Sequence, residues 1–208
     1  MPASIACDHR KIGLVKVEAG CLWWRVHHRK NASLQFNDST LGNARFSPIF
    51  NAAGNVIPTI YAAAEIRSAL METLLHDAPS PAHGFIYIAP VPEERVLVQL
   101  TNTAPLQLAN LQTLGLRRVG IKRADLIDSD KPAYTSTRAF ARALHAARPD
   151  VQGLSWHSRQ NHGEVIVLFA DRIAPGDLAV ATPAVSVADD DVQFALLELL
   201  AALGASAL

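Results

Sequence analysis

The sequence predicts an α+β fold in one domain, and three observations favour that class. Short apolar runs rich in β-branched and aromatic residues recur along the chain and end at Pro, Gly or Asn, which is typical of strands. Three other segments repeat apolar residues at helical spacing. The length of 208 residues suits a single domain with a substantial core. We therefore expect about six short strands and three helices.

The first part of the chain is expected to hold two strands separated by a long loop. Residues 21–28, CLWWRVHH, predict a strand in which alternation places Arg25 and Trp24 on opposite faces. The polar residues and glycines of 29–55 predict a loop, and loops of this length are usually functional or disordered. Residues 56–63, VIPTIYAA, predict the second strand.

An amphipathic helix is expected next, over residues 64–76, because apolar side chains recur there at i, i+3, i+4 and i+7. Glu65 and Glu72 lie about two helical turns apart and therefore share one stripe that flanks the apolar arc. Two short apolar runs follow at 84–91 and 95–100, and the turn residues between them predict a pair of strands.

The second half of the chain is expected to contain two helices and a hairpin. Residues 133–149 predict a helix, and 153–158 with 164–170 predict two strands around a turn. The last helix, at 190–203, starts with acidic residues and is apolar on more than one face, which indicates burial against the body of the protein or against a partner chain. The Pro- and Gly-containing stretch 174–187 is the best candidate for a boundary before a tail.

Composition narrows the possible functions. The chain carries 19 basic and 19 acidic side chains, so its overall charge gives no attraction to nucleic acid or to anionic lipid. Charged residues at 8–11 interrupt any signal peptide, and the most apolar stretch, 192–204, is shorter than a bilayer requires. Cys7 and Cys21 indicate reduced thiols. We expect a cytoplasmic protein without direct nucleic-acid or membrane binding.

Several catalytic motifs are absent from the sequence. There is no GxGxxG, Walker loop, HExxH or GxSxG, so Rossmann, P-loop, zincin and nucleophile-elbow chemistry have no support. His27 and His28 point to opposite faces of their strand, and His157 lies beside a turn without a nearby cysteine, so no metal site is expected. Alternation in GLSWHS places Ser155 and Ser158 on opposite faces, and no catalytic triad is visible.

Four blocks of sequence resemble the RES domain family, which is named for its Arg, Glu and Ser. They are LWWRVH, NARFSP, PTIYAAAEIRSALMETLLHD and GLSWHSRQNHGEVIVLF, in this order within residues 21–172. The family often has Gly-Arg-Trp where this chain has Ala-Arg-Phe. The resemblance implies an ADP-ribosyltransferase-like fold, with short mixed or antiparallel strands in two small sheets and flanking helices. It implies an N-terminal extension over 1–20, a RES domain over 21–175 and a C-terminal tail with one apolar helix over 176–208.

The resemblance also implies a set of site residues. Matched block by block, the family's functional positions are Arg25, Arg45, Tyr61, Glu72 and Ser158. Glu72, Arg45 and Ser158 would act in catalysis, and Arg25, Arg45, Tyr61 and Ser158 would bind NAD. Whether Ser155 or Ser158 faces the site stays open. No cofactor is implied beyond NAD as the substrate, and no metal.

The chemistry of NAD cleavage gives these residue types a reason. A planar guanidinium such as Arg45 can hold a diphosphate through a bidentate fork, and Arg25 would add a second cation. Breaking the bond from nicotinamide to ribose develops positive charge on the sugar, which the Glu72 carboxylate would stabilise. Tyr61 could stack on the flat nicotinamide ring, and the Ser158 hydroxyl could bind its amide or a ribose oxygen.

By resemblance the chain is a toxin of a type II toxin–antitoxin pair that cleaves the nicotinamide N-glycosidic bond of NAD, as an NAD phosphorylase or glycohydrolase. Two alternatives are an ADP-ribosyltransferase that modifies a host protein and a non-catalytic RES-like interaction protein. The acceptor of ADP-ribose therefore stays open between phosphate, water and protein. The implied partner is an antitoxin with a helix-turn-helix domain, in a homodimer or a higher toxin–antitoxin complex. The helix at 190–203 could form an interface or pack within the chain.

Overall fold

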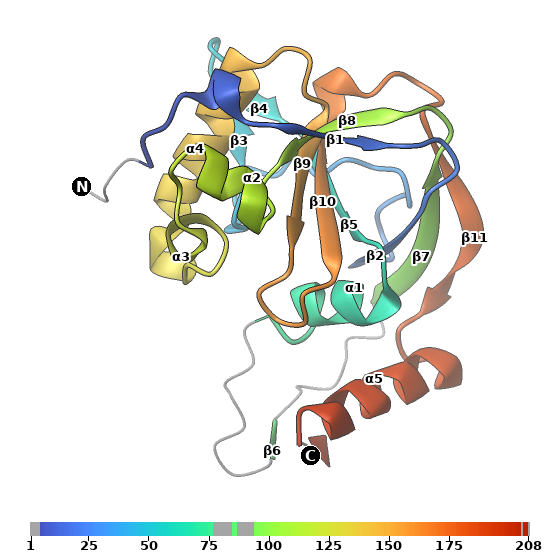
Figure 1. The fold of residues 1–208 in the computed structure, drawn as a ribbon. Coiled ribbons are helices and arrows are strands. Elements are labelled where there is room, and N and C mark those ends of the chain that lie inside the picture. Colours follow the sequence, from blue (N-terminus) through green and yellow to red (C-terminus); the bar gives the residue numbers. More distant parts are fainter. Residues whose placement is uncertain (1–4, 77–84, 87–93, 205, 208) are drawn as a thin grey trace.

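The computed structural model of the protein describes residues 5–76, 85–86, 94–204 and 206–207 and confirms the α+β class. Most of its strands form one sheet, with helices around it (Figure 1). Within the described residues, no helix combines the length and the apolar character needed to cross a bilayer.

Most strands belong to one curled sheet of eight. Their bounds are Leu14–Val17 (β1), Leu22–His28 (β2), Thr59–Ala63 (β5), Arg95–Asn102 (β7), Leu106–Asn110 (β8), Gly153–His157 (β9), Glu164–Phe169 (β10) and Leu178–Ser186 (β11). The order across the sheet is β1-β8-β9-β10-β5-β2-β7-β11. Neighbours are antiparallel except for β8 and β9, which are parallel. Two further ladders pair β3 (Ile49–Phe50) with β4 (Val56–Ile57), and β6 (Phe85–Ile86) with β12 (Ser206–Ala207).

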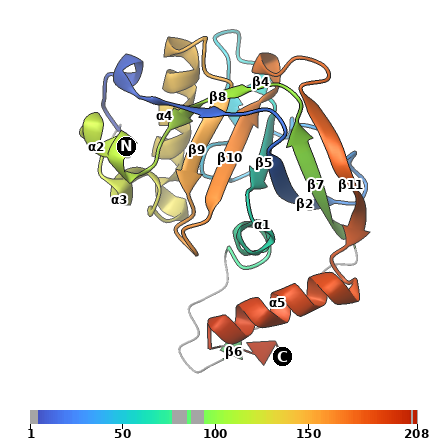
Figure 2. The same ribbon diagram turned by 45° about the vertical axis from the view of Figure 1, so that its right-hand side comes forward.

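The helices lie at two places around this sheet. Their bounds are Ile66–Thr73 (α1), Thr113–Arg118 (α2), Arg123–Leu126 (α3), Tyr134–Ala147 (α4) and Asp190–Ala202 (α5). Figures 1 and 2 show α2, α3 and α4 grouped beside β9, whereas α1 crosses one end of the sheet and α5 lies beyond α1. Arg67 of α1 and Glu198 of α5 form an ion pair at 3.1 Å, which ties the last helix to the body.

The join between β2 and β5 divides the large sheet into two parts. These strands share a single residue pair, Trp24 with Ala63, whereas β2 and β7 are paired over seven residues. The expected two sheets are therefore two parts of one curled sheet. A five-stranded part, β1-β8-β9-β10-β5, and a three-stranded part, β2-β7-β11, meet at one pair and diverge beyond it.

Residues 174–187, expected as a boundary before a tail, mostly form the edge strand β11 instead. It pairs with β7 from Leu178 to Ser186, with irregular register on both sides of Thr182. Pro183 falls within this irregular stretch. An edge strand tolerates a residue whose backbone donates no hydrogen bond. The sheet thus extends across both expected domain limits, since β1 precedes residue 21 and β11 follows residue 175.

The strand pair expected over 84–91 and 95–100 is only partly described. The second member is β7, which runs from Arg95 to Asn102. Of the first, only β6 is described, and it pairs in parallel with β12 instead of with β7. The rest of that expectation lies outside the described residues. The sequence reading also missed β1 and β8, which are four and five residues long and pair with each other.

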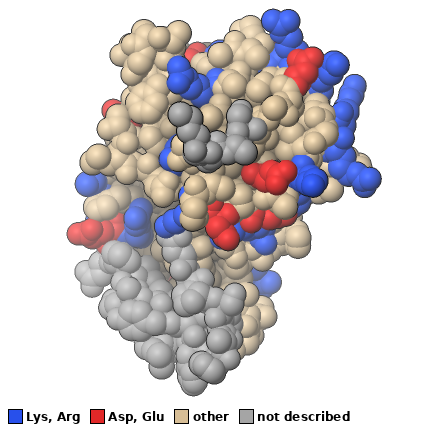
Figure 3. Space-filling view, turned by 90° about the vertical axis from the view of Figure 1, so that its left-hand side faces the viewer, with Lys and Arg blue, Asp and Glu red and all other residues tan. Residues whose placement is uncertain are grey.

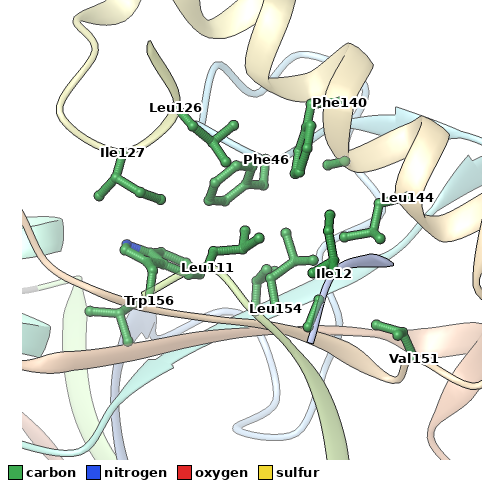
Figure 4. Close-up of a cluster of buried hydrophobic side chains, with 14 of the residues drawn as sticks. Ile12, Phe46, Leu111, Leu126, Ile127, Phe140, Leu144, Val151, Leu154 and Trp156 are labelled. Carbon is green, nitrogen blue, oxygen red and sulfur yellow. The ribbon is translucent and has the colours of Figure 1, made fainter. Parts of the chain in front are cut away.

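The main core lies between the five-stranded part of the sheet and α4. Figure 4 shows Phe46 beside Leu126 and Phe140 and above Trp156, all of them buried. The rings of Phe46 and Trp156 meet edge to face, with centroids 5.1 Å apart. Phe46, which stands where the family often has Trp, thus fixes the segment that carries Arg45 against the core.

A glycine lets β9 approach β10 closely. A Cβ atom at Gly153 would lie 2.1 Å from the Val167 carbonyl oxygen, which is far inside van der Waals contact. Gly153→Ala should therefore force the two strands apart and lower the free energy of unfolding by about 1–3 kcal/mol. Urea denaturation measures this change, and Gly13→Ala is the matched control because nothing lies within 4 Å of its Cβ position. Equal midpoints for the two variants would contradict the packing argument.

Candidate active site

A cavity of about 440 Å³ opens where β2 and β5 diverge. Residues 24–26 of β2 and 61–63 of β5 form two of its walls, and α1 and the segment 43–45 form others. The remaining lining comes from His76, Arg95, Lys131, Trp156 and Val165. The cavity therefore lies at the split in the sheet, where diverging strands leave space that side chains of neighbouring elements border.

The lining of the cavity is rich in positive charge. Arg25, Arg45, Arg95 and Lys131 contribute four cations, and Glu72 is the one carboxylate among the lining residues that the structure describes. The whole chain has equal numbers of basic and acidic side chains, and Figure 3 shows both signs on one outer face. The excess of positive charge is thus local, and a water-poor cleft lined by one sign of charge attracts anionic ligands.

Glu72 is held by a short hydrogen bond from a serine. The Ser158 Oγ donates to Glu72 Oε1 at 2.5 Å and accepts from the Gln160 backbone N–H at 3.0 Å. Ser158 is fully buried, and Glu72 is partly buried on α1. The hydroxyl therefore fixes one oxygen of the carboxylate, while Glu72 itself borders the cavity.

A second contact ties α1 to the same turn between β9 and β10. The Asn161 amide Nδ2 donates to Ser68 Oγ at 2.9 Å, and Ser68 is fully buried. Gly163 lies against Ser68, because a Cβ at that position would meet its Oγ at 1.9 Å. The helix that carries Glu72 is thus attached to the turn that carries Ser158 at two points, so the pair is held as a unit.

The guanidinium of Arg45 is occupied by protein oxygens. Its Nη1 donates to the carbonyls of Leu126 and Ser129, at 3.1 and 2.9 Å, and to Ser129 Oγ at 2.9 Å. Its Nη2 donates to the Tyr134 hydroxyl at 3.2 Å, and the guanidinium carbon lies 4.8 Å from the centre of that ring. Burial lowers the pKa of Arg45, and nearby Tyr134 and Glu72 oppose this effect. The arginine carries charge to the cavity and also joins the segment 43–48 to the end of α3.

The backbone around Arg45 is anchored from α4. Thr137 Oγ1 donates to the Arg45 carbonyl, and Arg138 Nη1 donates to Asn43 Oδ1 at 2.6 Å and to the Ala44 carbonyl at 3.3 Å. This turn has few apolar residues of its own, so hydrogen bonds from a regular helix define its position. The polar loop expected from the sequence is consequently ordered at the cavity wall.

Tyr61 is a neutral phenol in the cavity wall. Its hydroxyl accepts from the Phe46 N–H at 3.1 Å. Burial raises the pKa of Tyr61 to about 12, while hydrogen bonds with Ser47 and Phe46 oppose the rise. The ring meets Trp156 edge to face, with centroids 6.2 Å apart. The two rings form an aromatic wall that stays uncharged at neutral pH.

Arg25 is a buried cation on the opposite face of β2 from Trp24. Its neighbour Trp23 packs in the cluster beneath the sheet, whereas Trp24 packs on the cavity side. The Arg25 Nη1 and Nη2 donate to the carbonyls of Ser33 and Gln35, at 2.5 and 2.9 Å. Burial lowers the pKa of Arg25 to about 10. Arg25 is one of the lining residues, but its side chain leaves β2 on the face away from Trp24, and both terminal nitrogens of its guanidinium hold the loop after β2.

The structure brings four of the five expected residues, Arg25, Arg45, Tyr61 and Glu72, to the lining of one cavity. Ser158 lies behind Glu72 and reaches the cavity through that carboxylate. Ser155 points elsewhere: it is fully buried and its Oγ donates to Glu164 at 2.9 Å. Between the two serines, Ser158 is therefore the one that contacts an expected site residue.

Sequence reasoning missed several lining residues, which are Trp24, His76, Arg95, Lys131 and Trp156. Trp156 had a usable signal, because it lies two residues before Ser158 and alternation within the expected strand 153–158 places both on one face. Lys131 comes from the connection before α4, which carries no motif. His76 lies 3.0 Å from the Tyr134 hydroxyl. This contact joins residues far apart in the sequence.

The chain is thus a small α+β domain whose sheet divides at a basic cavity. Residues 22–198 match the family model of the RES domain, so the chain belongs to the RES domain family. The match includes β11 and most of α5, beyond the expected limit at 175.

Solved structures give a likeness of fold. A chain in the crystal structure of the M. tuberculosis MbcT–MbcA toxin–antitoxin complex superposes with a TM-score of 0.62 at 20% sequence identity. The comparison covers 89% of this chain and 92% of that one. No curated protein matches the chain. The expected fold is thus confirmed at the level of architecture.

Proposed function

We propose that this RES protein is the toxin of a toxin–antitoxin pair and consumes NAD by cleaving the bond between nicotinamide and ribose. The observation that carries the proposal is the cavity, in which one carboxylate stands among four cations and an aromatic wall. NAD presents a matching set of groups, namely a diphosphate, two sugars and two flat rings. Family membership and the fold of a chain from a toxin–antitoxin complex support the same assignment.

Glu72 is proposed to stabilise the charge that develops on the sugar. When the glycosidic bond breaks, its electron pair moves to the ring nitrogen, and neutral nicotinamide leaves an electron-poor ribose. An ionised carboxylate next to that sugar lowers the barrier, especially where water is excluded. The short hydrogen bond from Ser158 fixes one oxygen of Glu72, so reorganising the carboxylate during the reaction requires little free energy.

The aromatic wall is proposed to bind the leaving nicotinamide. Tyr61 and Trp156 border the cavity together with Trp24 on the opposite strand. Offset stacking or edge contact with a flat ring suits such a wall. Tyr61 keeps its proton at neutral pH because burial raises its pKa, so its hydroxyl can serve as a neutral hydrogen-bonding group for a ligand or for the 46–47 backbone.

The identity of the ADP-ribose acceptor depends on which molecule enters the cavity to attack the ribose. Attack by a phosphate oxygen on the ribose C1 forms a C–O bond as the bond to nicotinamide breaks, and it needs no base, because the attacking oxygen of the dianion carries no proton to lose. Attack by water requires the loss of a proton, which Glu72 could accept. The positive lining favours the phosphate anion, so we propose that the reaction is phosphorolysis, in preference to hydrolysis or transfer to a protein. The described residues contain no cluster of three potential metal ligands, and no metal is assigned a role.

The proposed partners are NAD and an antitoxin with a helix-turn-helix domain, within a homodimer or a larger complex in the cytoplasm.

A specific observation favours keeping the interaction-protein alternative. On α5, Phe194 and Leu197 are 64% and 54% exposed, although Leu196 and Leu200 of the same helix are buried. A protein that acts only through such a surface would not turn over NAD, so an activity assay separates the two functions.

The test is to incubate the purified protein with NAD, in the presence and absence of phosphate, and to measure products by mass spectrometry. We expect nicotinamide together with ADP-ribose 1″-phosphate when phosphate is present. Free ADP-ribose as the main product in phosphate would indicate hydrolysis, and ADP-ribose on a protein would indicate transfer. Intact NAD under all conditions would contradict the proposed function.

A further inference from the structure

The four cations of the cavity differ in what their side chains already bind. Both terminal nitrogens of Arg25 donate to backbone carbonyls, and both terminal nitrogens of Arg45 donate to oxygens of Leu126, Ser129 or Tyr134. Each of these guanidiniums therefore serves the protein's own loops. Arg25 and Arg45 therefore offer a ligand anion fewer than their five N–H donors, because part of each guanidinium already binds the protein.

Arg95, which was not expected as a site residue, is placed differently. It begins β7 and lies opposite His28, while Leu97 lies opposite Val26. Leu97 packs against Leu70 and Met71 of α1, so alternation places Arg95 on the face of the sheet that α1 covers. This is the face from which Glu72 borders the cavity. Arg95 is itself a lining residue.

The guanidinium of Arg95 has no acceptor in the part of the chain that the structure describes. None of the hydrogen bonds or ion pairs found there involves its side chain, although the residue is half-buried. The neighbouring carboxylate, Glu94, binds His28 Nε2 at 2.9 Å instead. The five N–H donors of Arg95 are thus available to a molecule that enters the cavity.

We propose that Arg95 is the arginine that binds the anionic part of the ligand, with its guanidinium fork on the oxygens of a diphosphate. The assignment rests on the proposed function for the identity of NAD, but the anion site itself follows from the geometry of Arg95. A planar fork matches phosphate oxygens in two parallel hydrogen bonds, which are about twice as strong as neutral ones. Arg25 and Arg45 then hold the cavity walls and add positive potential.

The anion site is tested with inorganic pyrophosphate as the probe, by calorimetry on the full chain. Arg95→Gln should weaken pyrophosphate binding at least tenfold. Arg29→Gln is the matched control, because Arg29 is exposed, adjoins the same strand end and is not part of the cavity lining. It should change the affinity less than twofold, since it removes the same net charge from outside the cavity. Equal effects of the two substitutions, or no binding by the unsubstituted protein, would overturn the assignment.

The kinetics of nicotinamide release separate this inference from the proposed function. Arg95→Gln should raise KM for NAD at least tenfold and change kcat less than threefold, and Arg95→Lys should restore part of the loss. An unchanged KM in Arg95→Gln, with active protein, would overturn the assignment of Arg95. Pyrophosphate binding that depends on Arg95, in a protein that never releases nicotinamide, would support the anion site and contradict the NAD-consuming function.

Discussion

Glu72→Gln should reduce the rate of nicotinamide release from NAD by about 10²- to 10³-fold while the protein keeps its fold. The amide retains the shape of the side chain and can still accept the Ser158 hydrogen bond through its oxygen. What it loses is the negative charge beside the electron-poor sugar. Removing one preorganised electrostatic group of this kind typically costs about 3–4 kcal/mol in the transition state. Initial rates at saturating NAD measure the effect.

The N-cap residue of the same helix provides the control. Glu65 precedes Glu72 by seven residues and is exposed outside the cavity. Glu65→Gln removes the same charge from the chain, and it should leave the rate within about twofold because exposed charges are well screened. Both variants should unfold at the same urea concentration as the parent protein. A Glu72→Gln variant with full activity would remove Glu72 from the catalytic role and leave the Ser158 pair as a structural contact.

Local patterns in the sequence predicted α4, β9, β10 and α5, but they did not predict the short helices α2 and α3. α4 lies at Tyr134–Ala147 inside the expected 133–149, and β9 and β10 form the expected hairpin. These segments have a clear period or a clear turn, so neighbours in the sequence decide their structure. The weaker signals of β1, β8 and β11 are different, because each is stabilised by a strand distant in the sequence.

The same distinction explains what was predicted of the site. Family blocks located Arg25, Arg45, Tyr61 and Glu72, and the structure places all four around one cavity. The partners of the two guanidiniums could not be predicted, since Arg45 binds carbonyls more than 80 residues away in the chain. A motif states which residue type stands at a position. It does not state which oxygens surround it after folding.

The split between β2 and β5 also had no signal in the sequence. Residues 21–28 and 56–63 both predicted ordinary strands, and they are neighbours in the sheet. Only the three-dimensional register shows that they meet at one pair, Trp24 with Ala63, and then separate. The position of the cavity depends on that divergence, so the lining from β2 and β5 became visible only in the folded chain.

Arg45→Lys should lower the free energy of unfolding by about 2–4 kcal/mol, because the guanidinium satisfies buried oxygens that an ammonium group cannot reach together. Four acceptors lie on its two terminal nitrogens: the carbonyls of Leu126 and Ser129, the Ser129 hydroxyl and the Tyr134 hydroxyl. Lys can donate to one or two of them from a single point. Each hydrogen bond lost from the charged guanidinium costs about 1.5–3 kcal/mol. The carbonyls of Leu126 and Ser129 keep longer bonds from Ser129 Oγ and Arg159 Nη1, both at 3.3 Å, so the total loss stays within this range of a few kcal/mol.

Urea denaturation of Arg45→Lys is best compared with Arg138→Lys. Arg138 donates to the same segment, at Asn43 and Ala44, but it is half-buried and its partners can reach water. Its substitution should cost less than about 1 kcal/mol.

If Arg45→Lys is instead as stable as the parent protein but binds NAD tenfold more weakly, then the guanidinium serves the ligand first. The bonds to Leu126 and Ser129 would in that case be dispensable, and Arg45 would take the place assigned to Arg95. Arg45→Lys could instead lose the full expected amount of unfolding free energy, about 2–4 kcal/mol, while its folded fraction binds pyrophosphate as tightly as the parent protein. Arg45 would then be the residue that holds the cavity wall, and Arg95 the residue that binds the anion.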